Sequence, residues 1–143
     1  MSELHFHVSK LHSVKEIQDQ FSQRYPFLRI NFFKKSKPGW GQSGARIILF
    51  SPDILVKDIN PEISDGELVI RESMTVRELE EYFFERFGLS TQILRKSGNL
   101  WLDTSRTNSW TLKEQDDHGR EISPDRLDNK GIIREYGIRR GLG

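Results

Sequence analysis

Acidic side chains are the residues of this sequence best suited to acid–base chemistry. They stand as adjacent pairs, Glu80-Glu81 and Asp116-Asp117. General acid–base catalysis needs two carboxylates that converge across a cleft, whereas neighbours in sequence are typical of a solvated helix face or loop. No serine lies in a Gly-x-Ser-x-Gly context either. The sequence therefore favours a non-enzymatic protein, and we expect no catalytic residue and no cofactor.

Two histidines of one segment could bind a metal. His5 and His7 alternate in Leu4 to Val8, which reads as a strand with both imidazoles on one face. A metal site needs a third ligand, and neither His12 nor His118 stands at a recognised spacing. Cysteine is absent, which excludes thiolate sites and disulfides. We expect a solvated strand face and no metal site.

The stretch from Lys34 to Gly44 is rich in lysine, glycine and proline, and reads as a loop. A phosphate-cradling loop would place its lysine and hydroxyl after the glycines, at the start of a helix. Here the lysines come first, and Arg46 to Phe50 reads as a strand, so we reject a nucleotide-binding loop. Two interpretations remain: an ordinary strand connection, or a basic loop in which Trp40 touches nucleic acid or an acidic partner.

The elements that would position these residues occur twice. Residues 13–25 recur at 75–87 with four identical and five conservative positions. Each copy begins with a capping box, Ser13 with Glu16 and Thr75 with Glu78. Each then carries one apolar stripe of an amphipathic helix. The stripe residues are Val14, Ile17, Phe21 and Tyr25 in the first copy and Val76, Leu79, Phe83 and Phe87 in the second.

Strand-like segments flank both predicted helices. They are Leu4 to Val8, Leu28 to Lys34 and Arg46 to Phe50 in the first copy, and Glu67 to Arg71, Thr91 to Lys96 and Asn99 to Thr104 in the second. The unit is thus β-α-β-β, made twice. We predict an α+β fold: a ferredoxin-like antiparallel sheet with two helices on one face. Residues 1–60 form the first repeat, 61–116 the second, packed with the first as one domain, and 117–143 a polar, disordered connection with a basic tail.

Residues 67–90 resemble the ubiquitin-like β-grasp pattern, in which a strand leads to a Thr-Val helix start, an apolar stripe and Gly-Leu-Ser. Residues 106–112 resemble the Thr-Leu turn after the fourth strand of that family, and 138–143 its basic, glycine-ended tail. The resemblance implies one or two β-grasp units as the alternative fold. It also implies either a protein-interaction module or a modifier conjugated through Gly143. Residues 98–104 and 110–112 are similar to small uncharacterised bacterial proteins, which imply no activity.

Three aromatic residues are the predicted protein-binding set. Tyr82 and Phe84 lie at the two flanks of the second helix stripe, where the first helix has Gln20 and Ser22. Trp101 lies on the strand face opposite its two neighbouring leucines. Large aromatics beside a core stripe indicate extra burial, within the chain or against another protein. We therefore expect a protein-interaction module whose partner is another protein.

Nucleic-acid binding by a ferredoxin-like sheet is the remaining alternative. Its candidate residues are Arg29, Lys34, Lys35, Lys37, Arg95 and Lys96. Sheets that read RNA stack bases on aromatics in a Gly-Phe-rich strand, a signature that both strands lack. Net charge is +1 overall, with an excess of positive charge in residues 1–60 and of negative charge in 61–129. Nucleic acid is therefore not the favoured partner.

Composition places the chain among globular proteins, with 35% hydrophobic and 30% charged residues over 143 positions. The start lacks the basic region and apolar run of a secretion signal. The longest apolar run, Ile47 to Phe50, is too short to cross a bilayer. We expect a cytoplasmic protein that does not contact a membrane.

Overall fold

Two capping boxes start the central helices. In the computed structural model the Ser13 hydroxyl accepts from the Glu16 N–H, and the Glu16 carboxylate accepts from the Ser13 N–H. Thr75 and Glu78 repeat both bonds. Each exchange satisfies two donors that a helix start leaves unpaired. The predicted helix starts are confirmed.

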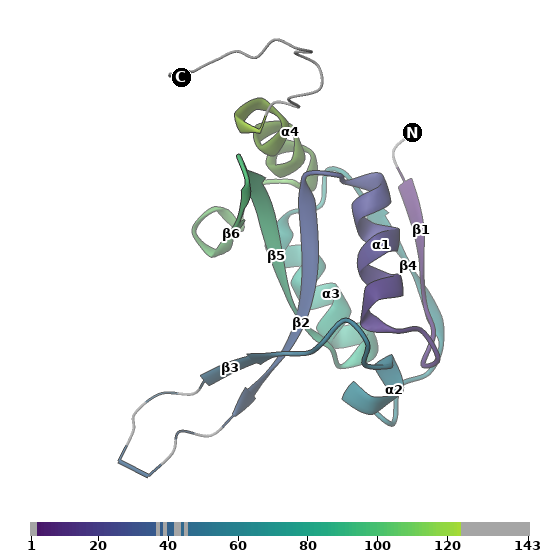
Figure 1. Ribbon diagram of the computed structural model, residues 1–143. Helices are drawn as coiled ribbons and strands as arrows, with labels where there is room; N and C mark the ends of the chain where they lie inside the picture. The colour runs from purple at the N-terminus through teal and green to yellow at the C-terminus, as the bar shows by residue number, and fades with distance from the viewer. Residues whose placement is uncertain (1–2, 37, 39, 42–43, 45, 124–143) are drawn as a thin grey trace.

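The structure describes residues 3–36, 38, 40–41, 44 and 46–123 (Figure 1). Lys37, the tail from residue 124 and the proposed conjugation site Gly143 lie outside the described residues. The strands are β1 (Glu3–Val8), β2 (Leu28–Ser36), β3 (Arg46–Leu49), β4 (Gly66–Arg71), β5 (Ser90–Ser97) and β6 (Leu100–Asp103). The helices are α1 (Val14–Arg24), α2 (Val56–Ile59), α3 (Val76–Phe87), α4 (Leu112–Ile122) and the 3-10 turn η1 (Ser105–Thr107).

The described strands form two sheets. One is the antiparallel pair β1–β4, and the other is an antiparallel sheet in the order β3-β2-β5-β6. The α+β class with antiparallel sheets is confirmed, but the strand pairing differs from the single sheet of the ferredoxin-like plan. The reason lies in the helices. Phe6 of β1 contacts Phe21 of α1 and Phe83 of α3, while Phe32 of β2 contacts Phe83 from the other side. The β1–β4 pair therefore covers a side of the helices that the larger sheet leaves open.

The two repeats are intertwined rather than side by side. In the β1–β4 pair Phe6 lies opposite Leu68, its own counterpart 62 residues later. In the β2–β5 pair Asn31 lies opposite Gln92, its counterpart at the 61-residue offset of the two Lys-Ser pairs. A pseudo-twofold axis therefore passes between both pairs of residues. Neither repeat completes a sheet alone, because the β1–β4 pair and the β2–β5 pair each join one strand of the first repeat to one strand of the second.

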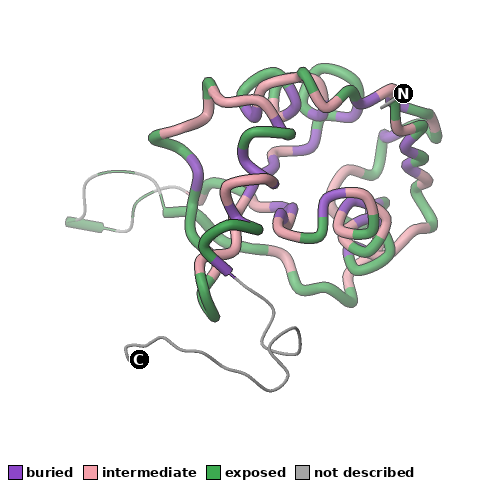
Figure 2. The backbone as a smooth tube through the Cα atoms, turned by 90° about the horizontal axis from the view of Figure 1, so that it is seen from above, coloured by how far each residue is buried: buried purple, intermediate pink, exposed green. Residues whose placement is uncertain are grey.

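The core lies between the two sheets, where Figure 2 shows the buried segments gathered. Phe83 is fully buried and contacts the rings of Phe6, Phe32 and Phe87 at centroid distances of 5.7, 6.0 and 6.2 Å. The contacts with Phe6 and Phe32 are edge-to-face, a geometry that stabilises beyond the area it buries. The fully buried stripe residues of both helices confirm the predicted core faces.

The helices begin in reciprocal pairs. The N–H of Val14, at the start of α1, donates to the carbonyl of Ile54 at 2.9 Å. In return the N–H of Val56, at the start of α2, donates to the carbonyl of His12 at 2.8 Å. Free first-turn donors of one helix are thus satisfied by the chain that leads into the other.

The second repeat makes the same exchange and so extends into α4. The N–H of Val76 donates to the Trp110 carbonyl (3.1 Å), and the N–H of Leu112 donates to the Met74 carbonyl (2.8 Å). The disordered connection predicted from Asp117 onward is wrong up to Ile122, because these residues complete α4. Docking on β5 holds the helix: a Cβ at Gly119 would lie 2.9 Å from the Phe27 Cβ, so only glycine permits this approach.

Candidate binding face

Alternation along β2 and β5 leaves one face of the four-stranded sheet open. Leu28, Ile30 and Phe32 are buried, and the residues between them are half-buried. β5 alternates in the same way. Side chains of a strand alternate between faces, and the helices among the described residues cover one face of this sheet. We call the other the outer face. On the described strands it carries Arg29, Asn31, Phe33 and Lys35 of β2, Ile47 and Leu49 of β3, Gln92, Leu94 and Lys96 of β5, and Trp101 and Asp103 of β6.

A groove of about 320 Å³ lies where the outer face meets α1. Arg29 and Trp101 form one wall, with the guanidinium carbon 5.8 Å from the indole ring centroid. Pro52 and four polar residues of α1 complete the lining, namely Lys15, Gln18, Asp19 and Ser22. An arginine beside an indole offers a cation and a flat apolar surface in one place. Such a pair suits a ligand that carries a carboxylate next to an apolar group.

α1 positions this groove by covering the open edge of β2. The Gln18 amide donates to the Ile30 carbonyl at 3.0 Å and to the Asn31 amide oxygen at 3.1 Å. The Ser22 hydroxyl donates to the Leu28 carbonyl at 3.0 Å. β3 pairs with β2 only from Phe33 onward, which leaves these carbonyls to the helix. Arg29 is thus held on a strand whose edge is fixed.

Glu80 of α3 is the counterpart of Gln18, 62 residues later. Burial raises the pKa of the Glu80 carboxyl to about 7, helped by the charges of Asp103 and Glu81 and opposed by a hydrogen bond from the Ile93 N–H. The predicted solvated pair Glu80-Glu81 is therefore only half correct, since Glu81 is exposed but Glu80 faces β5. The signal that could have found it is the Gln-to-Glu difference between the repeats.

We predict that Glu80→Gln stabilises the protein at neutral and alkaline pH. A carboxyl whose pKa rises on folding binds more protons in the folded state, so stability falls as pH rises from about 4.5 to about 7. Glutamine keeps an acceptor for Ile93 and carries no charge to desolvate. We expect a gain of about 1–2 kcal/mol at pH 8, below the full linkage value because solvent screens a partly exposed group. Urea unfolding of both proteins at pH 4 and pH 8 measures it; an equal gain at pH 4 would contradict the titration of Glu80.

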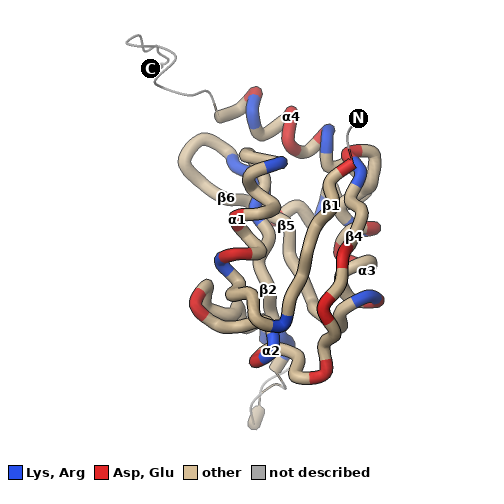
Figure 3. Tube along the Cα trace, turned by 90° about the vertical axis from the view of Figure 1, so that its right-hand side faces the viewer, with Lys and Arg blue, Asp and Glu red and all other residues tan. Residues whose placement is uncertain are grey.

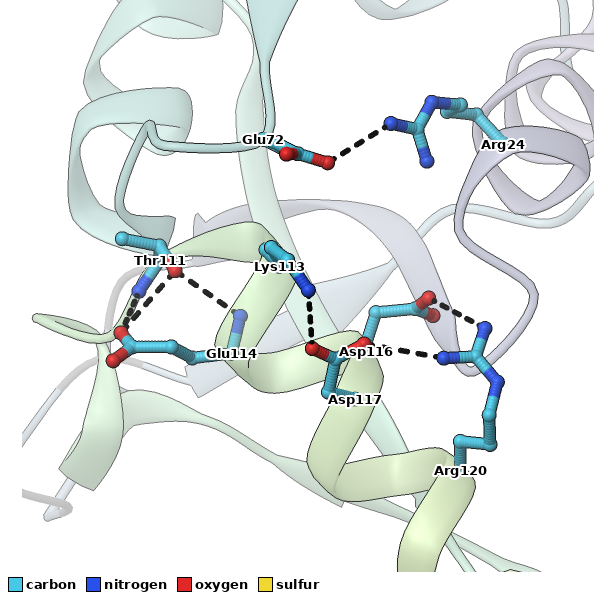
Figure 4. Close-up of polar contacts among 8 residues, drawn as sticks. All are labelled: Arg24, Glu72, Thr111, Lys113, Glu114, Asp116, Asp117 and Arg120. Atoms are coloured by element: carbon cyan, nitrogen blue, oxygen red, sulfur yellow. Dashed lines mark hydrogen bonds and ion pairs between the residues drawn. The ribbon is translucent and has the colours of Figure 1, made fainter. Parts of the chain in front are cut away.

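Figure 4 shows a second polar cluster where α4 docks. Asp116 is 6% exposed; its carboxylate accepts from the Phe27 N–H at 2.9 Å and pairs with Arg120 at 3.2 Å. Asp117 pairs with Lys113 at 2.7 Å and with Arg120 at 3.2 Å. Burial raises the pKa of Asp116, whereas the hydrogen bond from Lys113 lowers the pKa of Asp117. Asp116 holds α4 to the chain before β2 through Phe27, and Asp117 pairs only with residues of α4 itself among those described, so both carboxylates have structural partners.

The predicted protein-binding residues do not form one surface. Tyr82 packs against the core, and its hydroxyl accepts from the Val69 N–H at 3.4 Å. Phe84 is 60% exposed and lies on the other flank of α3, one turn after Glu80. Trp101 lies on the outer face of the sheet. The burial predicted for the off-stripe aromatics therefore holds within the described residues for Tyr82, and burial of Phe84 against another protein stays a prediction.

The six predicted nucleic-acid residues also divide. Arg29, Lys35 and Lys96 lie on the outer face, together with Trp101. Lys34 and Arg95 point to the opposite face, where Arg95 donates to Gln115 at 2.7 Å and lies over the Trp110 ring. Lys37 lies outside the described residues. The alternation of the strands is the signal that separates the two groups.

His5 and His7 are exposed on the β1–β4 face, as predicted. Glu67 contacts both, with its oxygen 3.1 Å from His5 Nδ1 and 3.8 Å from His7 Nε2. No group of three or more metal-ligating side chains occurs in the part of the chain that the structure describes. In Figure 3 this face shows acidic residues along β4 and the turn before it.

Comparison with known proteins returned no match: no protein-family model, no curated protein and no solved structure is significantly similar to this chain. Within the described ranges, none of the helices has the length and apolar character needed to cross a membrane.

Proposed function

We propose that this chain is a non-enzymatic protein-interaction module that binds its partner on the outer face of the four-stranded sheet. The supporting observation is the open face itself. It presents Trp101 and Phe33 with aliphatic neighbours and three cations, and it contains the groove between Arg29 and α1. Apolar side chains gathered on an open face mark interaction sites.

The chemistry of the face favours a protein segment with acidic and apolar side chains. A carboxylate would pair with Arg29 while an apolar group packs on Trp101. Single-stranded nucleic acid would need a groove of cations that follows its backbone. Here Asp103 lies in the same cross-strand row as Arg29 and Leu94, and Ile47 and Leu49 extend the face with aliphatic side chains. The ubiquitin-like resemblance stays a prediction, and the proposal does not rest on it.

The test compares tagged full-length protein with Trp101→Ala and Arg29→Glu variants, recovered from the native host under gentle conditions. We expect at least one protein partner that both variants lose, with an affinity loss of tenfold or more for Trp101→Ala, because an aromatic side chain beside an arginine is a typical hot spot. Phe84→Ala is the matched control, since it removes an exposed aromatic from a different surface.

Two outcomes would contradict this proposal. One is recovery of the same proteins with all variants. The other is recovery that nuclease abolishes, with binding to oligo(dT) at low salt that Trp101→Ala weakens, which would assign the outer face to nucleic acid.

A further inference from the structure

β3 is an edge strand with an unusual composition. Its residues are all exposed, and three consecutive aliphatics, Ile47, Ile48 and Leu49, are 56, 42 and 51% exposed. It belongs to an arm, formed by β3 and the part of β2 from Phe33 on, that projects from the body in Figure 1. Edge strands usually carry charges or proline that prevent pairing with another chain. β3 carries neither between Ile47 and Leu49.

On the edge of β3 away from β2, where no other described strand pairs, lie the backbone groups of Ile47 and Leu49. The Phe50 N–H donates to the Phe32 carbonyl at 2.9 Å, which makes Phe32 and Phe50 a hydrogen-bonded pair. Hydrogen-bonded and non-hydrogen-bonded pairs alternate along an antiparallel ladder. The N–H and C=O of Ile48 therefore point toward Lys34 of β2, and those of its two neighbours point away from the sheet.

We infer that β3 pairs antiparallel with β3 of a second copy of this chain, with Ile48 on the twofold axis. In this register Ile47 of each copy exchanges two hydrogen bonds with Leu49 of the other, so four donors and four acceptors are satisfied. Ile48 faces its own counterpart, and Arg46 faces Phe50. Every aliphatic residue of β3 then lies opposite an aliphatic residue, and no two like charges lie opposite each other.

The neighbouring register satisfies the backbone groups of β3 but matches its side chains less well. Moving the axis to Ile47 places the charged Arg46 opposite the aliphatic Ile48. The other free edge, β6, presents Trp101 and Asp103, because the Thr104 N–H donates to Ile93 and sets the alternation there. If β6 paired with itself around Leu102, Trp101 of each copy would lie opposite Asp103 of the other, so that a carboxylate lies beside each indole. β3 is therefore the edge suited to a second copy.

The arm enlarges this contact beyond a single strand. Stable interfaces bury about 1,000 Å² or more, which four strand residues do not supply. Antiparallel pairing directs the Arg46 end of each β3 toward the body of the other copy. Trp40, at 102% relative exposure, then gains a surface to pack on. The two outer faces become one continuous eight-stranded face, although the dimer does not depend on what that face binds.

Cysteine cross-linking tests the register directly, because the natural sequence has no cysteine. The side chains of a non-hydrogen-bonded antiparallel pair approach most closely, so Ile48→Cys should form a covalent dimer on mild oxidation. Ile47→Cys is the matched control, because residue 47 of one copy lies opposite residue 49 of the other, so the two introduced cysteines are too far apart to cross-link readily. We expect sedimentation to give a dimer for the full-length protein and more than half of Ile48→Cys to cross-link, at least fivefold more than Ile47→Cys. A monomer up to 100 µM, or equal cross-linking of the two variants, would overturn the proposal.

Ile47→Pro removes one N–H that points away from β2 and leaves the β2–β3 ladder intact. We expect the dimer to dissociate at least tenfold more readily while the circular dichroism spectrum stays unchanged. Leu102→Ala on β6 should leave the dimer as it is. If Ile47→Pro dimerised as tightly as the wild-type protein, or if Leu102→Ala weakened the dimer equally, the contact would lie elsewhere and the inference would be overturned. Neither variant alters Arg29 or Trp101, so this result is separate from the test of the outer face.

Discussion

Phe83→Ala is expected to lower the free energy of unfolding by about 3–5 kcal/mol, the range measured for phenylalanine truncation in cores. The ring is fully buried and contacts phenylalanines from β1, β2 and α3. These contacts join both sheets to the same helix. β1 and β2 belong to different sheets and cannot both move into the cavity that the missing ring leaves, so the cavity stays unfilled. Chemical denaturation followed by circular dichroism measures the loss.

Two further variants make this prediction specific. Phe21 is the counterpart of Phe83 in the first repeat and is equally buried. Among the described residues, however, its ring contacts two aromatic rings, those of Phe6 and Tyr25. We expect Phe21→Ala to be somewhat less destabilising. Phe84→Ala, next to Phe83 but 60% exposed, should change stability by less than about 0.5 kcal/mol. A loss below about 1 kcal/mol for Phe83→Ala would show that the two sheets are not held through this ring.

Asp116→Ala is expected to cost about 2–3 kcal/mol and to loosen α4. The substitution leaves the partly buried Phe27 N–H without its acceptor and Arg120 without one of its two carboxylates. Because burial raises the pKa of this carboxyl, desolvation already offsets part of the gain from its contacts, and the expected loss stays below the roughly 3–5 kcal/mol that breaking a fully buried ion pair costs. Hydrogen exchange of the α4 amides, together with the unfolding free energy, measures both effects.

Conservative and surface substitutions serve as controls for Asp116. Asp116→Asn keeps an oxygen that accepts from Phe27 and should cost about 1 kcal/mol. Asp117→Ala removes a carboxylate that only makes exposed ion pairs, and should stay within about 0.5 kcal/mol. If Asp117→Ala proved the more damaging change, ion pairs on the surface rather than the buried hydrogen bond would hold α4.

The helices and most strands were predictable from the sequence because their causes are local. Ser13 with Glu16 and Thr75 with Glu78 define helix starts through bonds that span three residues. The spacing of Phe21 and Phe83 identifies the buried face of each helix from the 3.6-residue period. Alternation in β2 likewise placed Arg29 and Phe33 on one face, since the period of a strand is two.

α4 begins with a local signal, the capping box of Thr111 and Glu114, but it was missed from Asp117 onward because the cause of its continuation is not local. The segment contains Gly119 and several charges, and it lacks the apolar stripe that marks α1 and α3. Its first turn is held by the chain before α3, through the Leu112 bond to Met74, and its middle by the docking of Asp116 on Phe27. The composition of such a helix shows that it is polar. Its burial depends on the neighbouring elements and cannot be predicted from the segment itself.

The sequence by itself determined the repeated β-α-β-β unit, the capped helices and the side of each strand that faces the core, because all of these follow from spacing within one segment. The tertiary structure alone decided which strands pair. Phe6 lies opposite Leu68, and Asn31 opposite Gln92, only because the two repeats bury their helices in one shared core. That choice brings Arg29 of the first repeat beside Trp101 of the second and leaves β3 at an edge. Residues 72 positions apart become one site through packing that no local pattern encodes.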